Sequence, residues 1–130
     1  VAGHRLGTRE IEEAVSAHPA IAEVAVVGVA DQLKGQMPLA FAVVKDAASA
    51  ATPELRAALE KEVMAKVDSL LGAIGRPKRV HFINQLPKTR SGKVLRRSIQ
   101  AIAEGRDPGD LTTLDDPIGI QMVKEAVEGK

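Results

Sequence analysis

The sequence predicts an α+β domain in which helices flank a small, mostly antiparallel sheet of about three strands. Three observations support this prediction. Apolar residues recur at helical spacing in several segments, two apolar runs typical of strands lie close enough to form a hairpin, and turn residues separate these segments. The helical segments are segregated from the few strand segments, which favours an α+β arrangement.

The first half of the chain contains the predicted hairpin. Thr8 is a candidate N-cap for a helix that Ile11, Ala14 and Val15 continue at helical spacing. Pro19 ends this helix. The next segments are a strand at 21–30, a turn at 31–35, a strand at 38–44 and a small-residue linker at 46–52, which we expect to be a mobile surface loop.

The second half begins with the clearest helix signal. Thr52, Pro53 and Glu54 combine a cap, a proline and an acid in the first turn. Five apolar residues follow at steps of three and four: Leu55, Leu59, Val63, Val67 and Leu70. We then expect a strand at 79–83, a loop at 86–93, a helix from about 95 to 105, an acidic turn-rich segment at 106–116 and a final helix from Asp116 to about Val127.

Composition excludes several classes of protein. The chain has 130 residues, of which 45% are apolar and 27% charged, as in ordinary globular domains. The absence of cysteine excludes disulfide scaffolds and thiolate sites, and fits a reducing location such as the cytoplasm. Aromatic residues are limited to Phe41 and Phe82, and the net charge is +1, so nucleic-acid binding is not expected. No apolar run approaches the roughly 20 residues of a membrane-spanning helix.

Charge is distributed unevenly along the chain. Residues 76–97 contain eight basic and no acidic residues, whereas residues 104–130 contain seven acidic and three basic ones. A basic stretch of this kind indicates either a solvated face or a site for a polyanionic ligand.

The segment from Pro87 to Lys93 is the sharpest motif within the basic stretch. Proline and glycine shape a turn that leads into a helix, where a lysine could reach a phosphate or carboxylate oxygen. It is not a Walker A loop, because Pro87 stands where that motif needs glycine and Val94 where it needs Ser or Thr. An anion-binding loop and a solvated basic turn both remain open.

Other polar residues carry less information. Gly3, Arg5 and Gly7 precede the first helix and indicate either a close approach of the backbone to a ligand or a plain loop. No two histidines stand at a metal-ligand spacing, so we predict no metal site. The carboxylates of Glu12 and Glu13 are interpreted as residues of a helix face.

Two motifs occur in order about 85 residues apart: GHRLGT-x-EIE from Gly3 to Glu12, and LPKTRSGK from Leu86 to Lys93. Together they resemble the C-terminal domain of acyl-CoA synthetases, which belong to the adenylate-forming superfamily. The GHRLGT form points to the short-chain branch. Ala2, the segment 8–13 and the tail 104–113 resemble the propionate–CoA ligases most, and the acetyl-CoA synthetases next.

The resemblance implies a two-step reaction. A carboxylate attacks ATP to give an acyl-adenylate and pyrophosphate, and CoA then displaces AMP to form a thioester. Residues 1–105 would be the mobile C-terminal catalytic domain and residues 106–130 an extension with a final helix. The chain begins within a motif, so we expect a larger N-terminal domain that holds most of the ATP, Mg²⁺ and acyl contacts. The chain alone is then expected to be inactive.

The resemblance also implies roles for individual residues. Lys93 matches the lysine that assists adenylation, and Arg5 an arginine near the nucleotide phosphates. Gly3 and Ala2 match the loop that lines the CoA tunnel. Thr89, Arg90, Ser91 and Gly92 would shape the lysine loop. Lys93 would also be a target of reversible acylation by a protein acyltransferase and a deacylase, which would remove its charge.

One position departs from the family pattern. Related acetyl-CoA synthetases carry an arginine on the long helix that contacts the CoA phosphate, and counting back from Lys93 places Asp68 there. Either Lys66 substitutes, or CoA is held by groups such as Arg76 or Lys78. Without the resemblance, the basic stretch would favour a non-catalytic module that binds an anion or a partner, and a structural oligomerisation domain would be a weaker third interpretation.

Overall fold

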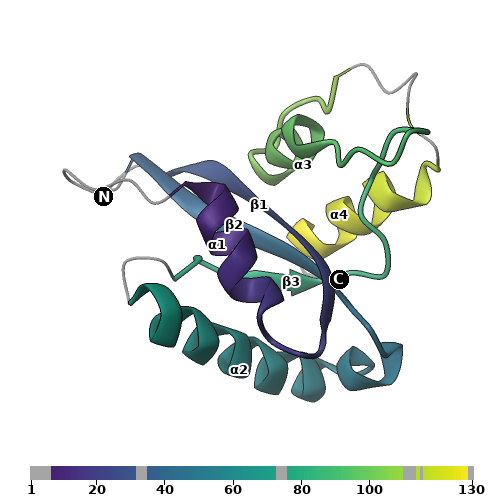
Figure 1. Ribbon diagram of the computed structural model, residues 1–130. Coiled ribbons are helices and arrows are strands. Elements are labelled where there is room, and N and C mark those ends of the chain that lie inside the picture. The colour runs from purple at the N-terminus through teal and green to yellow at the C-terminus, as the bar shows by residue number, and fades with distance from the viewer. Residues whose placement is uncertain (1–6, 32–34, 73–75, 110–113, 115, 129–130) are drawn as a thin grey trace.

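The structure, a computed structural model of the chain, describes residues 7–31, 35–72, 76–109, 114 and 116–128. Figure 1 labels the elements. They are α1 (Thr8–Ser16), β1 (Ile21–Asp31), β2 (Gly35–Val44), the 3₁₀ helix η1 (Ala47–Ala50), α2 (Pro53–Leu71), β3 (Val80–Phe82), α3 (Arg96–Ala103) and α4 (Ile118–Glu128). The predicted α+β class is confirmed.

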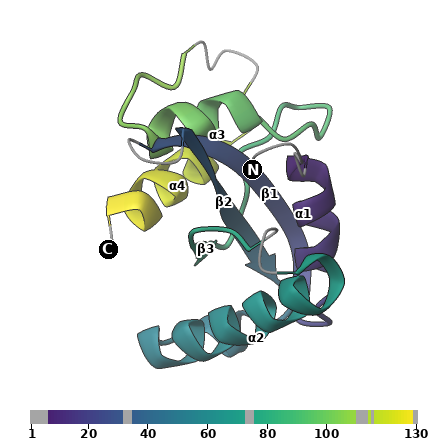
Figure 2. The same cartoon turned by 90° about the vertical axis from the view of Figure 1, so that its left-hand side faces the viewer.

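The sheet is a central layer between two pairs of helices (Figure 2). Its strands follow the order β1-β2-β3. Alternate residues of β1 enter different clusters: Val24 and Val26 pack with α1 and α2, whereas Ala25 and Val27 pack with α3 and α4. Because both faces are covered, β1 is almost continuously apolar rather than strictly alternating.

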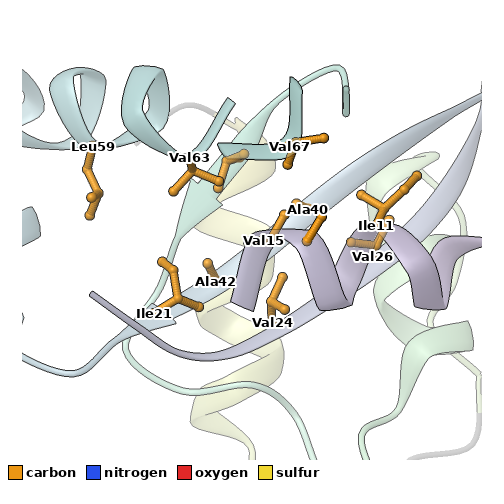
Figure 3. Packing of buried hydrophobic residues seen from close by; sticks show 12 residues of the cluster. Ile11, Val15, Ile21, Val24, Val26, Ala40, Ala42, Leu59, Val63 and Val67 are labelled. Carbon is orange, nitrogen blue, oxygen red and sulfur yellow. The ribbon is translucent and has the colours of Figure 1, made fainter. Parts of the chain in front are cut away.

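The first cluster joins α1 and α2 to one face of the sheet (Figure 3). The buried residues of α2 are Leu59, Val63 and Val67, at steps of four. Leu55 and Leu70, which share this apolar spacing, are 43% and 54% exposed, so the buried stripe is shorter than the apolar pattern in the sequence. They lie in the first and last turns of α2, which the other described residues leave uncovered.

Two strands differ from their predicted form. β2 begins at Gly35, before Pro38, and pairs with β1 in the antiparallel sense. The Pro38 carbonyl accepts from the Lys78 N–H, so the N–H that proline lacks would also lie on the β3 side of the strand. Proline is tolerated there because the ladder with β3 begins only at Ala40. β3 is shorter than predicted. It runs parallel to β2, because η1 and α2 carry the chain back to the starting end of the sheet before β3 begins.

The helix boundaries follow local capping bonds. Thr8 is helical rather than the N-cap we predicted; Gly7 takes that position and its N–H donates to Glu10 Oε1 over 3.3 Å. Thr52 does cap α2, because its hydroxyl accepts from the Leu55 N–H over 3.2 Å. The linker at 46–52 is not a featureless loop, since Asp46 caps η1.

The remaining helices lie close to their predicted positions. α3 ends before Gly105, whose φ of +78° favours glycine. The Asp116 carboxylate accepts from the Ile118 N–H over 3.0 Å at the start of α4. No described helix has the length and apolar character that a membrane crossing requires.

Side chains of the helices cap the free edges of the sheet. On β1, the Val26 N–H donates to Glu12 over 2.8 Å and the Ala30 N–H donates to Glu104 over 2.8 Å. On β3, the Val80 N–H donates to Glu60, also over 2.8 Å. Covered edges do not recruit further strands, and these bonds fix the helices against the sheet.

Candidate functional site

The lysine loop, residues 86–93, folds as a tight hairpin. The Thr89 N–H donates to the Lys93 carbonyl and the Gly92 N–H donates to the Thr89 carbonyl, both over 2.9 Å. Lys88 pairs with Val94 as an isolated antiparallel bridge. Together with the positive φ of Gly92, this pattern is that of a hairpin turn closed by a glycine.

Side chains reinforce this turn from within. The Thr89 hydroxyl accepts from the Lys93 N–H over 3.1 Å and lies 2.9 Å from Ser91 Oγ. Gly92 has φ +90°, a conformation that L side chains rarely adopt. Thr89 and Ser91 therefore contribute side-chain contacts to this turn and Gly92 a positive φ, while Arg90 is exposed.

Lys93 combines a rigid backbone with a free side chain. Leu86 and Pro87, at the base of the loop, are buried. Lys93 itself is exposed and forms no ion pair with any other residue that the structure describes. The loop thus presents a mobile ammonium group from a fixed base, as a site for an anionic ligand requires.

The basic stretch at 76–97 is not a uniform cationic surface. Half of its basic residues are neutralised by carboxylates, in the pairs Arg76–Asp68, Arg79–Glu60, Lys88–Glu23 and Arg96–Glu12. Lys78, Arg90, Lys93 and Arg97 have no ion pair among the described residues. Two of these four cations, Arg90 and Lys93, lie in the lysine loop itself.

The pair between Glu12 and Arg96 connects α1 to the start of α3, just after the lysine loop. The Arg96 guanidinium donates from Nη2 to Oε1 over 2.7 Å and from Nε to Oε2 over 2.9 Å. The hydrogen bond to Glu12 raises the pKa of Arg96, and burial opposes it. We had interpreted Glu12 only as a residue of a helix face; no sequence signal pairs residues 84 positions apart.

A double-mutant cycle isolates this pair. Glu12→Gln keeps an oxygen that accepts from the Val26 N–H and removes only the charge, whereas Arg96→Met removes the guanidinium. We expect each change to lower the free energy of unfolding by about 1–2 kcal/mol, since the pair is bidentate but partly exposed. Urea unfolding of both single variants and the double variant measures their coupling. Additive effects would contradict a net contribution from this pair.

Of the other residues that the sequence analysis singled out, some lie outside the described part of the chain and others have a partner. Ala2, Gly3 and Arg5 lie outside the described residues. Asp68 is not free, because its carboxylate pairs with Arg76, and Nε–Oδ1 spans 3.1 Å. That bond raises the pKa of Arg76. An acid on the long helix thus engages one of the cations that could have held a phosphate.

The described histidines have structural partners. His18 Nδ1 accepts from the Ala20 N–H and Nε2 bonds to Glu62, each over 3.0 Å. His81 stacks on Phe41 with ring centroids 5.2 Å apart. Among the described residues there is no group of three His, Asp or Glu side chains that could hold a metal ion.

We expect His81 to make the free energy of unfolding depend on pH. Burial lowers its pKa from the usual value of about 6.5, Arg79 adds to the effect and Glu60 opposes it. The unfolded chain then binds more protons than the folded one below about pH 6.5, so stability falls as pH drops from there toward the folded pKa. Urea unfolding between pH 7.5 and 5 measures this slope, and His81→Phe should reduce it. An NMR titration midpoint at or above 6.5 would contradict the prediction.

Two concavities in the described part lie around β3. One, of about 410 Å³, is lined by Lys78, His81, Glu104 and their neighbours, and the other, of about 790 Å³, lies between α2, β3 and α4. Lys93 lines neither of them. Its ammonium group is presented on the surface of this domain.

A family model described as the AMP-binding enzyme C-terminal domain matches residues 10–93, and the match ends at the exposed lysine. The chain belongs to this family. The chain is 60% identical over 128 residues to the propionate–CoA ligase of Escherichia coli (strain K12), covering 98% of the chain and 20% of the relative. It is 48% identical to an acetyl-coenzyme A synthetase of Pyrobaculum arsenaticum, with 98% and 18% covered.

A solved structure supports the same fold for this AMP-binding C-terminal domain. The crystal structure of an acyl-CoA synthetase from Brucella canis superposes with a TM-score of 0.60 at 36% identity, covering 72% of this chain and 16% of that chain. The domain spans about a fifth of the length of the relatives that it matches.

Proposed function

We propose that this domain is the C-terminal part of a longer, cytoplasmic, AMP-forming ligase that converts propionate, ATP and CoA to propionyl-CoA, AMP and pyrophosphate. The identity of 60% to a propionate–CoA ligase, against 48% to an acetyl-coenzyme A synthetase, supports propionate over acetate. In this proposal residues 1–105 move as the catalytic domain, residues 106–130 form its extension, and the rest of the ligase holds the acid and most of the nucleotide.

The observation that carries the proposal is the exposed Lys93 on its internally bonded loop. In the first step a carboxylate oxygen attacks the α-phosphorus of ATP, and the bond to the β-phosphate oxygen breaks to release pyrophosphate. Both reactants are anions. An ammonium group that contacts both offsets their repulsion and orients the attack. In the second step the CoA sulfur loses its proton, attacks the acyl carbon and expels AMP.

The second step would use a different part of the domain. We assign Gly3 and Ala2 to the tunnel for the pantetheine arm, and at Gly3 the lack of a side chain would leave room for the arm to pass. Arg5 is assigned to the nucleotide phosphates. Because Asp68 pairs with Arg76, Lys66 and Lys78 are the better candidates for the CoA phosphates. Any Mg²⁺ that accompanies ATP is assigned to the remainder of the ligase.

We also propose that Lys93 is regulated by acylation. Its exposure would allow a protein acyltransferase to reach it, and an amide at Nζ has no charge with which to assist adenylation. Mass spectrometry of the peptide that contains Lys93, before and after treatment with a deacylase, would follow the modification. Activity that stays constant while Lys93 becomes acylated would contradict this role.

The full-length ligase provides the test of function. We would measure pyrophosphate release with propionate, acetate and butyrate as competing acids. The highest kcat/KM is expected with propionate, and the 130-residue chain alone should give no turnover. A preference for acetate would make the ligase an acetyl-CoA synthetase, and no acid-dependent release would remove the ligase proposal altogether. Binding of polyanions to the isolated chain that weakens steeply with salt would instead favour an anion-binding module.

A further inference from the structure

The C-terminal helix α4 touches the base of the lysine loop at Gly119. A Cβ on Gly119 would lie 2.7 Å from both Cα and N of Pro87, and 3.0 Å from the carbonyl carbon of Leu86. All three are backbone atoms, which cannot rotate away as a flexible side chain can. The glycine is therefore required for close approach between α4 and the loop rather than for its own backbone conformation.

Side chains hold α4 in this position. Ile120 and Val123 are 5% and 0% exposed and belong to the same cluster as Leu86 and Ile99. α4 lies beside α3 in both views of the fold (Figures 1 and 2). Ile120 and Val123 of α4 and Leu86 at the loop base are all buried in this cluster, so a clash at Gly119 would have to displace α4 and the loop base relative to each other.

The segment before α4 makes a second contact. Leu114 pairs with Thr89 as an isolated antiparallel bridge. Thr89 is the residue whose backbone and hydroxyl both bond to Lys93. The family model ends at Lys93, so Leu114 and α4 lie outside the matched region.

We propose that Leu114 and α4 form the rigid base of the lysine loop, and that Gly119 is a positioning residue for adenylation. This inference rests on the proposed role of Lys93. To reach an ordinary contact of 3.4 Å, a methyl group at 2.7 Å would require a relative shift of about 0.7 Å between α4 and Pro87. A displacement of about 1 Å at a reacting group can cost on the order of 100-fold in rate.

The test uses the full-length ligase with Gly119→Ala. We expect propionate-dependent pyrophosphate release to fall about 10- to 100-fold in kcat, while thioester formation from supplied propionyl-adenylate stays within about twofold. Lys124→Ala, an exposed change in the same helix, is the matched control and should leave both steps unchanged. Alanine is the better helix former, so a loss cannot be attributed to helix propensity.

Hydrogen exchange gives a readout that is independent of activity. The Thr89 and Leu95 amides, which bond to Lys93 and Pro87, should exchange faster in Gly119→Ala, while the amides of the β1–β2 ladder keep their protection. Val123→Ala loosens α4 without a clash and serves as a second variant if Gly119→Ala does not fold. It should produce the same selective loss of adenylation, only smaller.

Several outcomes overturn the inference. Unchanged adenylation in both variants would exclude a positioning role, and an equal loss of both steps with weakened ladder protection would indicate a purely structural one. Lys93→Ala, assayed in parallel, separates the two proposals. If Lys93→Ala abolishes adenylation but the α4 variants do not change it, only the positioning inference fails. If Lys93→Ala leaves adenylation intact, the proposed role of Lys93 fails.

Discussion

Replacing Lys93 with alanine in the full-length ligase should lower propionate-dependent pyrophosphate release by about 10²–10³-fold, the usual loss when one preorganised electrostatic group is removed. Thioester formation from supplied propionyl-adenylate should stay near the wild-type rate, since the anions that Lys93 is proposed to bridge are present only in the first step. The two half-reactions are measured separately, by coupled pyrophosphate detection and by thioester chromatography.

Two variants in the same loop make this test specific. Arg90→Ala removes another exposed cation that lacks a described ion-pair partner, and we expect less than a threefold effect. Lys93→Arg keeps the charge but spreads it over a larger planar group, so partial activity is expected. If both half-reactions survive Lys93→Ala, the loop is only a basic turn and the anion-binding module becomes the better interpretation.

Removing the side chain of Phe41 should produce the largest loss of stability. Phe41 is fully buried in the central strand β2, within the cluster that α3 and α4 cover, and its ring stacks on His81. We expect Phe41→Ala to lower the free energy of unfolding by about 3–5 kcal/mol, the usual cost of a buried aromatic deletion. Because domains are stable by only about 5–15 kcal/mol, this variant approaches the limit of folding. Urea unfolding measures the difference.

The chain's other aromatic residue is a matched control. Phe82 is half-buried at the edge strand β3 and packs only against the margin of the first cluster. Phe82→Ala removes the same atoms and should cost clearly less than Phe41→Ala. Equal losses at the two sites would mean that the α3–α4 side of the sheet is packed no more tightly than the edge. Leu70→Ala, which truncates an exposed side chain, should change stability by no more than about 0.5 kcal/mol.

Local rules explain why much of the chain could be interpreted from its residues. Thr52 and Pro53 start α2 because a hydroxyl cap and a proline need only their immediate neighbours. The lysine loop could be located because Pro87 and Gly92 indicate a turn, and the positive φ of Gly92 agrees with that turn. Thr8 is not the cap that we predict from its hydroxyl, because Gly7 takes the N-cap position and its N–H donates to Glu10.

Contacts between distant segments could not be predicted in this way. Whether Leu55 and Leu70 are buried depends on how far the sheet extends beneath α2, and no spacing encodes that extent. The parallel sense of β3 depends on the path of the crossover, and three paired residues leave little pattern to detect.

The sequence by itself determined the α+β class, the main helices and the hairpin, because periodicity, capping and turn chemistry act over a few residues. Lys93 was singled out by the resemblance of two motifs to acyl-CoA synthetases. Only the tertiary structure decided which cations are neutralised and what supports the loop. Glu12 contacts Arg96, and Gly119 contacts Pro87, although the partners are far apart in the sequence. The packing of four helices on one sheet brings them together. From the sequence alone, a glycine within a helix only weakens that helix. The structure shows that the missing side chain of Gly119 leaves room for the backbone of Pro87.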